Sequence, residues 1–191
     1  MFINDPHSDL LDPAPHKWWN QLRQGEKRGL ELIYSFYVDD MYRFGMAIKS
    51  NRALIKDCIQ EVFVSLWKYR TNLKDTENVR LYLFRSLSNK IHREVGAHLS
   101  KYHEESAEHF DYLHTVESYE QRWIQDQGIE ISRNKLKLAL EKLPLRQKEL
   151  IQLLYFENLP YEEISFTMNL HIKSVYTLAW KAINNLKKSM K

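Results

Sequence analysis

The sequence predicts an all-α protein built of two small helical domains joined by a linker. Glycine and proline, the residues that most often break helices, number only five each in 191 residues. Apolar residues recur every three or four positions over long stretches, which is the period of an amphipathic helix. The charge distribution then divides the chain, because residues 103–130 carry one basic and eight acidic side chains between two weakly basic blocks.

Composition excludes several classes of protein. Hydrophobic residues make up 43% of the chain and charged residues 28%, so we expect a packed core and not global disorder. The single cysteine, Cys58, excludes an intramolecular disulfide framework and a cysteine-rich zinc site. No run approaches the roughly 20 apolar residues of a membrane span, and the acidic, proline-rich start lacks the pattern of a secretory signal. We therefore expect a cytoplasmic protein without stable membrane insertion.

The first block is predicted to hold an N-terminal tract, residues 1–27, and a helical domain over residues 28–98. Apolar stripes predict helices in "HKWWNQLRQGEKRGLELIYSFYVDDMYRFGMAIKS", in "NRALIKDCIQEVFVSLWKYR" and in "VRLYLFRSLSNKIHREV". The polar segment "TNLKDTEN" is predicted to be a loop between the last two. The neighbouring Trp18 and Trp19 either pack on this domain or dock a partner, and the sequence leaves both readings open. Cys58 lies on an apolar face and is predicted to be a core residue.

The second block, residues 132–191, follows an acidic linker over residues 99–131 and contains a predicted helix-turn-helix. Pro144 should open a helix, because proline suits a first helical turn. Ser165 is small enough for a helix crossing, and Asn169 tolerates the left-handed conformation that the turn requires. The last helix has one apolar face. Its opposite face presents groups suited to DNA phosphates and base edges: Lys173, Ser174, Tyr176, Thr177, Trp180 and Lys181. On this pattern alone, an ordinary helical hairpin with a solvated face is the alternative.

Several segments, in this order, resemble a bacterial sigma factor of the extracytoplasmic-function (ECF) subfamily of the sigma-70 family. "DCIQEVFVSLW" is similar to the polymerase-binding helix of region 2, and "VRLYLFRSLSNKIHREV" is similar to its promoter-melting segment. "ALEKLPLRQKELIQLLYFENLPYEEIS" and "SVYTLAWKAINNLKK" are similar to region 4. The resemblance implies a non-catalytic initiation factor. Region 2 would dock on the coiled-coil of the largest RNA polymerase subunit and open the −10 element, while region 4 would read the −35 element.

The resemblance also implies two functional surfaces in region 2. The polymerase-binding face would lie opposite the apolar stripe of the second helix: Asp57, Gln60, Glu61 and Val64. The −10 DNA would meet the third helix through Arg80, Arg85, Asn89, Lys90 and Arg93. Asn89 aligns with the family asparagine near the flipped −10 base, and the "TNLKDTEN" loop is expected to help form the base pocket. Tyr82 and Phe84 are either stacking platforms for a base or core residues.

The predicted −35 face departs from the family pattern. Many members carry arginines where this chain has Tyr176 and Leu178, so Lys173 and Lys181 are the only cations of this face. Since each lost phosphate contact weakens salt-dependent affinity, isolated region 4 should bind DNA weakly and regain affinity through tethering in the holoenzyme. Leu178 is a candidate for the core. A stand-alone helix-turn-helix regulator and an adaptor that binds polymerase without opening DNA are the alternative functions.

The expected partners are core RNA polymerase, promoter DNA and, as in many members of the family, an anti-sigma factor. We expect no cofactor and no metal. The histidines and carboxylates between His98 and His114 lack the spacing of metal ligands. The acidic linker either follows a positively charged channel of the polymerase or is a solvated tether.

Overall fold

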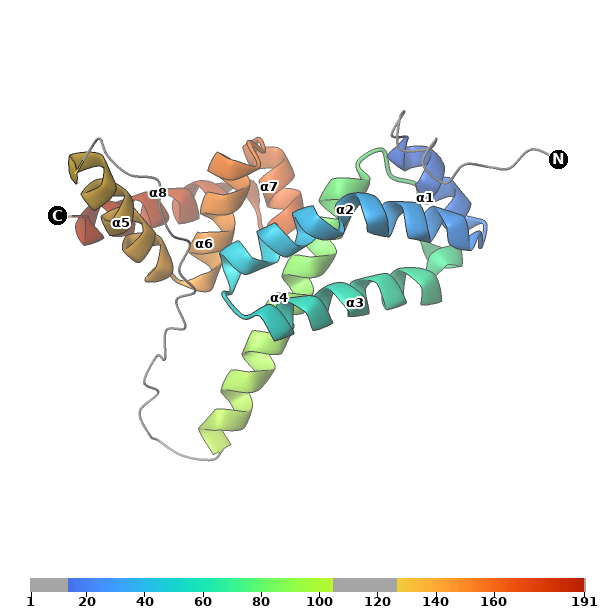
Figure 1. Cartoon of the computed structure of the whole chain (residues 1–191), viewed down its shortest axis with the longest axis horizontal. Helices are drawn as coiled ribbons and strands as arrows, with labels where there is room; N and C mark the ends of the chain where they lie inside the picture. Colours follow the sequence, from blue (N-terminus) through green and yellow to red (C-terminus); the bar gives the residue numbers. More distant parts are fainter. Residues whose placement is uncertain (1–13, 105–126, 191) are drawn as a thin grey trace.

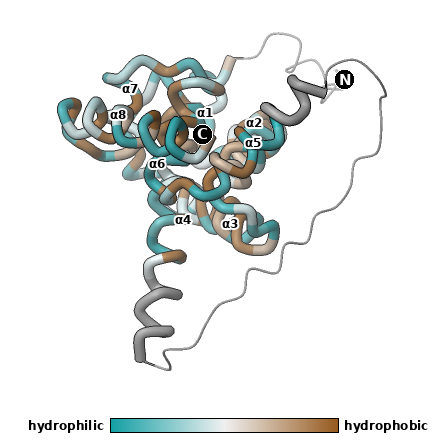
Figure 2. Tube along the Cα trace, turned by 90° about the vertical axis from the view of Figure 1, so that its left-hand side faces the viewer, coloured by the Kyte–Doolittle hydropathy of each residue, from teal (hydrophilic) through white to brown (hydrophobic). Residues whose placement is uncertain are grey.

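The computed structural model describes residues 14–104 and 127–190, and every regular element within these ranges is a helix. The predicted all-α fold class is therefore confirmed. Figure 1 shows two groups of helices, one from each block of the sequence. Figure 2 shows hydrophobic and hydrophilic residues alternating along the helices, as expected when one face of each helix is buried.

The first group is formed by the N-terminal half of the chain. Its elements are α1 (Pro15–Arg23), α2 (Lys27–Ile48), α3 (Arg52–Lys68), the 3₁₀ turn η2 (Arg70–Asn72) and α4 (Val79–Glu104). Pro15 occupies the first position of α1, where its missing N–H costs no helical hydrogen bond. Asn51 begins α3 and Asn78 begins α4, because each side-chain oxygen accepts a backbone N–H from the first turn.

Helix α1 packs into the core of this group, although the sequence assigns it to the N-terminal tract. Trp18, Trp19 and Leu22 are all buried, so the two tryptophans pack on the domain. The turn between α1 and α2 contains Gly25 at φ 90°, which favours glycine. The two helices cross so closely that a Cβ on Gly29 would lie 2.4 Å from the Trp18 carbonyl oxygen. The close crossing therefore requires glycine at this position.

The second group is formed by the C-terminal part of the chain. Its elements are α5 (Gln127–Glu141), α6 (Leu145–Ile151), the π-helical turn η3 (Gln152–Phe156), α7 (Tyr161–Met168) and α8 (Ile172–Ser189). Pro144 directly precedes α6, in agreement with the predicted helix start. Asn169 has φ 52° and ψ 48° between α7 and α8, so the predicted left-handed turn is confirmed. The Ser165 hydroxyl donates to the Leu170 carbonyl oxygen at 2.7 Å and closes this turn.

The predicted linker, residues 99–131, is described only at its ends. Helix α4 continues to Glu104 and α5 begins at Gln127, so both ends of this segment are helical. The weak apolar periodicity there gave little signal of where each helix stops. The described residues do not include His109, His114 or most of the acidic side chains of this linker.

The two groups contact each other, because α7 packs on α4 and α6 packs on α2 (Figure 1). Within residues 14–104 and 127–190, every helix is too short or too polar to cross a membrane.

Candidate polymerase and nucleic-acid interfaces

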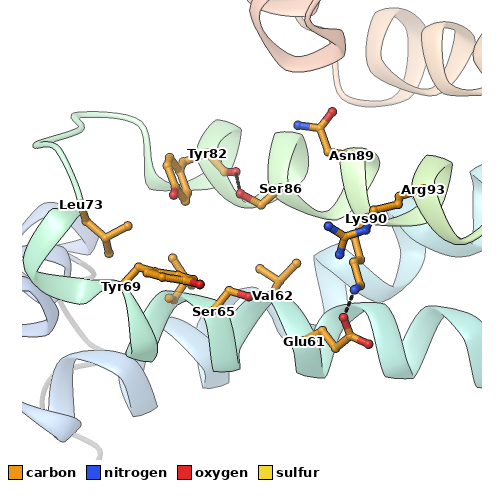
Figure 3. A pocket seen from close by; sticks show the side chains of 11 residues that line it. Glu61, Val62, Ser65, Tyr69, Leu73, Tyr82, Ser86, Asn89, Lys90 and Arg93 are labelled. Carbon is orange, nitrogen blue, oxygen red and sulfur yellow. Dashed lines mark hydrogen bonds and ion pairs between the residues drawn. The ribbon is translucent and has the colours of Figure 1, made fainter.

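A pocket of about 280 Å³ opens between α3 and α4, and we call it the α3–α4 pocket (Figure 3). Its walls come from α3 and its C-terminal end, from the loop after η2 and from α4. The polar and aromatic lining groups are Glu61, Ser65, Tyr69, Tyr82, Ser86, Asn89, Lys90 and Arg93. Aromatic rings beside hydroxyl and cationic groups provide the chemistry needed to hold an unstacked base next to its phosphate.

Three of the five predicted −10 residues lie at this pocket: Asn89, Lys90 and Arg93. Asn89 is exposed at the rim, and Figure 3 shows its amide pointing away from Glu61. The Lys90 ammonium pairs with the Glu61 carboxylate and lies 3.3 Å from that of Glu94. Arg93 keeps 68% of its side chain exposed. The exposed Arg93 guanidinium and Asn89 amide are thus the groups best placed to meet a DNA strand.

Sequence reasoning identified only part of the pocket lining. Ser86 comes four residues before Lys90, so helical spacing places both on one face of α4. This spacing could have predicted that Ser86 lines the pocket. Tyr69 and Leu73 reach the pocket through the η2 turn, and no local pattern indicates this. The segment "TNLKDTEN" contributes Leu73 to the wall of this pocket, and its role in holding a DNA base stays a prediction.

Tyr82 and Phe84, the two candidate residues for stacking on a base, lie in different surroundings. Tyr82 lines the α3–α4 pocket, and its ring contacts that of Trp19 edge-on, with centroids 4.9 Å apart. Phe84 is fully buried and stacks on Phe44 at 4.4 Å. Phe84 is therefore a core residue, and its burial keeps it from contacting a base.

A larger hollow of about 820 Å³ lies between α2 and α3, and we call it the α2–α3 groove. Its apolar lining is Leu30, Tyr34, Val38, Tyr42, Ile59, Phe63, Val64 and Trp67. Polar groups come from Asp39, Lys56 and Gln60. Val64 is 59% exposed and Tyr34 is 46% exposed. An exposed apolar hollow with polar groups around it is typical of a surface that binds another protein.

The predicted polymerase-binding residues do not all lie at this groove. Gln60 and Val64 line it, whereas Glu61 lies at the α3–α4 pocket and pairs with Lys90. Asp57 is exposed one helical turn before Glu61. Consecutive residues point about 100° apart around a helix, so one exposed side of α3 borders two different hollows. The sequence analysis did not predict that Tyr34 lines this groove. The i, i+4 spacing of Tyr34, Val38 and Tyr42, beside the core stripe of the same helix, was a detectable signal of a second apolar face.

Helix α8 presents the predicted −35 residues. Lys173, Ser174, Thr177 and Lys181 line a shallow hollow together with Leu178. Leu178 is half-buried and also packs against the core, as considered from the sequence. The Tyr176 ring stacks on Tyr161 at 4.3 Å, and Trp180 is 67% exposed. All six predicted residues are thus carried by one helix.

The other two predicted −10 residues, Arg80 and Arg85, lie on the side of α4 that faces the second helical group. The Arg80 guanidinium pairs with the Glu157 carboxylate. Arg85 donates to the Asn169 side-chain oxygen at 3.0 Å and lies over the Phe166 ring at 4.3 Å. In this arrangement the five predicted −10 residues divide between two sides of α4, and only three share the pocket.

A buried carboxylate stabilises the contact between the two groups. Glu149 of α6 is fully buried and accepts a hydrogen bond from the buried Ser88 hydroxyl of α4. The same carboxylate lies 2.6 Å from His92 Nε2 and 3.5 Å from Arg146 Nη1. A buried charge is tolerated only when it is paired. Ser88 and His92 of α4 therefore give this contact specific polar partners, while Arg146 lies on the same helix as Glu149.

Cys58 is buried in α3, which confirms its predicted place in the core. Burial raises the pKa of its thiol, so the thiol stays protonated and unreactive near neutral pH. Among the residues that the structure describes, no group of three or more His, Cys, Asp or Glu side chains is placed to hold a metal ion.

Residues 33–98 match sigma-70 region 2, and residues 133–185 match sigma-70 region 4. This chain is an ECF sigma factor of the sigma-70 family. Sigma factors of this family are not enzymes; they bind core RNA polymerase and promoter DNA and direct promoter recognition at the start of transcription. The α3–α4 pocket and the α2–α3 groove thus belong to region 2, and α8 belongs to region 4. Helix α1 precedes the residues matched to region 2.

Individual relatives support this assignment. The chain is 24% identical to the ECF RNA polymerase sigma factor SigM of Bacillus subtilis (strain 168) over 159 residues, which cover 83% of this chain and 93% of SigM. Its fold is similar to that of the sigma factor RpoE, solved in complex with the anti-sigma factor NepR from Bartonella quintana. That similarity has a TM-score of 0.63 at 16% identity and covers 82% of this chain and 93% of RpoE. CnrH, solved in complex with the cytosolic domain of CnrY, gives a TM-score of 0.60 at 15% identity over 91% of this chain and 95% of CnrH.

Proposed function

We propose that this sigma factor docks on core RNA polymerase through the α2–α3 groove and captures −10 DNA in the α3–α4 pocket. The observation that carries the proposal is that the two hollows lie on either side of α3. Val64 and Gln60 face the groove, while Glu61 and Ser65 face the pocket. A polymerase segment bound in the groove would therefore hold the pocket at a fixed distance from the polymerase surface.

The groove suits a helical partner of amphipathic character. Its exposed aromatic and aliphatic side chains offer apolar contact area, as in the centre of a protein–protein interface. Asp39, Lys56 and Gln60 offer charge and hydrogen bonds for orientation. The coiled-coil of the largest polymerase subunit is a partner of this chemistry.

The α3–α4 pocket provides the −10 contacts. An unstacked base would lie against Tyr69 or Tyr82, with its edge toward the serine hydroxyls and the Asn89 amide. Arg93 and Lys90 would contact the adjoining phosphates. Stacking explains affinity for a single strand, and the hydrogen-bonding groups supply sequence preference.

Helix α8 reads the −35 element with low intrinsic affinity. Lys173 and Lys181 are the two cations of its exposed hollow, so few phosphate charges are neutralised there. Tethering through polymerase-bound region 2 raises the effective concentration of α8 at the promoter. Tyr176 and Trp180 add apolar surface for sugars or thymine methyl groups.

Promoter binding through all five predicted −10 residues requires region 4 to leave α4. Arg80 and Arg85 are engaged by Glu157, Asn169 and Phe166, so these guanidinium groups are not available to phosphates in the arrangement described. An anti-sigma factor that stabilised this closed arrangement would keep the factor inactive.

The chain would act in the cytoplasm, where RNA polymerase transcribes DNA.

The first test is binding of the full chain to core RNA polymerase that lacks any sigma factor. We expect tight one-to-one binding, followed by permanganate-reactive thymines upstream of a start site on promoter DNA. Val64→Asp places a charge in the apolar groove and should weaken binding about 10-fold or more, whereas Val64→Ile keeps the apolar contact and should bind normally.

The outcomes separate the alternative functions. Polymerase binding without unpaired thymines would support an adaptor instead of an initiation factor. DNA binding without polymerase binding would support a stand-alone regulator. Equal binding by wild type and Val64→Asp would remove the groove as the docking site.

A further inference from the structure

Helix α1 holds the loop that forms one wall of the α3–α4 pocket. The indole Nε1–H of Trp19 donates to the Lys74 carbonyl oxygen at 3.0 Å. Nε–H of Arg23 donates to the Leu73 carbonyl oxygen, also at 3.0 Å. Two consecutive carbonyl groups of the loop are therefore bound by side chains that lie 55 and 50 residues earlier in the chain.

Ionic contacts reinforce the same attachment. The Asp75 carboxylate lies 3.4 Å from Arg23 Nη1 and 3.3 Å from His16 Nε2. These groups are between about one third and three fifths exposed, so they add orientation more than stability. Together with the two hydrogen bonds, these ionic contacts hold the loop segment 73–75 against α1.

Trp19 also touches a second element of the pocket wall, helix α4. Its fully buried indole meets the Tyr82 ring edge-on at 4.9 Å, and Tyr82 lines the pocket from α4. Trp19 thus contacts Tyr82 directly and reaches Leu73 through the neighbouring Lys74 carbonyl. Tyr82 and Leu73 both belong to the lining of the pocket, on two different elements.

The position of α1 is itself tightly determined. Gly29 permits the close crossing of α1 and α2, and Leu22 is fully buried behind Trp19. A rigid helix that binds a short loop through directional hydrogen bonds can set the loop position to a fraction of an ångström. A flexible loop would accommodate different bases with similar affinity.

We propose that Trp19 and Arg23 are positioning residues that set the base preference of the −10 pocket by fixing Leu73–Asp75 and Tyr82. The inference rests on the proposed role of the α3–α4 pocket and adds that its selectivity is controlled from α1, outside the residues matched to region 2. Neither residue contacts DNA; both act through the shape of the pocket.

The test uses holoenzyme reconstituted with the full chain and a promoter library randomised over the −10 and −35 elements. Open complexes are isolated and sequenced, which gives the preference for each base at each −10 position. Trp19→Phe keeps an aromatic ring in the core but removes the N–H donor. Arg23→Lys keeps the charge beside Asp75 but removes the Nε donor. Each variant should reduce the preference at the pocket position about 5-fold, the effect of one lost hydrogen bond, while polymerase binding is unchanged.

Trp18→Phe is the matched control. Trp18 is buried on the same helix, but its ring meets Phe36 at 5.4 Å and not the loop. A general effect of changing a buried tryptophan would appear in both variants, whereas a positioning effect appears only at Trp19. Thermal unfolding of all three variants reports any loss of stability separately.

The possible results are distinct. A loss of preference confined to one −10 position, seen with Trp19→Phe and Arg23→Lys but not with Trp18→Phe, supports the proposal. Unchanged preferences, or equal loss of opening on all sequences, would overturn it. If wild-type holoenzyme shows no −10 preference at all, the proposed function of the pocket fails first, and the positioning role fails with it.

Discussion

The proposed −10 pocket and the proposed −35 surface of this sigma factor are built in opposite ways. The α3–α4 pocket is enclosed by two helices and a loop, and α1 supports it through Trp19 and Arg23. The −35 surface is one side of α8, with its two lysines exposed to solvent. The first site depends on distances between elements, whereas the second depends mainly on which residues follow one another along a helix.

This difference predicts different responses to substitution. In an assembled pocket, one changed side chain alters the shape available to the ligand, so effects are large and specific for sequence. On a single exposed helix, each side chain contributes a nearly independent contact, so effects are small, additive and sensitive to salt. Four substitutions, at three places in the molecule, test the contrast.

The largest effect is expected for Asn89→Ala at the rim of the pocket. Loss of an amide that hydrogen-bonds a base edge should reduce open-complex formation about 10-fold or more, without changing polymerase affinity. Permanganate reactivity at a fixed holoenzyme concentration measures this loss. Asn134→Ala, at an exposed position of α5, is the control and should open the promoter normally. Normal opening by Asn89→Ala would show that the rim of the pocket does not read the strand.

A smaller effect, in the opposite direction, is expected for Glu157→Gln. The substitution removes the Glu157 charge beside Arg80 and leaves the Asp40 carboxylate, 3.8 Å from Arg80 Nε, in place. The new amide keeps a partner in Gln152, whose side chain lies 2.9 Å from that of Glu157. The free chain should then bind a single-stranded −10 oligonucleotide about 3-fold more tightly, consistent with the modest worth of a partly exposed ion pair.

Fluorescence anisotropy at two salt concentrations measures this change. Glu162→Gln on α7 alters the net charge equally at an exposed site and serves as the control. An equal gain for both variants would indicate a general charge effect and would argue against release of Arg80.

The smallest effects are expected on α8. Lys173→Ala and Lys181→Ala should each lower the slope of log affinity against log salt by about 1 and weaken −35 binding only a few-fold. Titrations of duplex DNA at several salt concentrations measure the slope. Lys187→Ala, near the C-terminal end of the same helix and outside the hollow, should leave it nearly unchanged. A loss as large as that expected for Asn89→Ala would contradict the contrast between the two sites.

Local sequence signals predicted much of this molecule. Apolar periodicity predicted the helices, and Asn169 marked the left-handed turn. The apolar stripe on α8 also defined its opposite, exposed side, which carries Lys173, Ser174, Thr177 and Lys181. The chemistry of α8 was readable in advance because residues on one face of a helix are related by a fixed spacing in the chain.

The sequence by itself determined which residues are helical and which side of each helix is apolar, because both depend on neighbours within a few positions. Only the tertiary structure decided that Glu61 faces a pocket while Gln60 faces a groove, that Arg80 and Arg85 meet region 4, and that α1 holds the loop at Leu73. These outcomes depend on contacts between residues far apart in the chain, which helical periodicity does not encode.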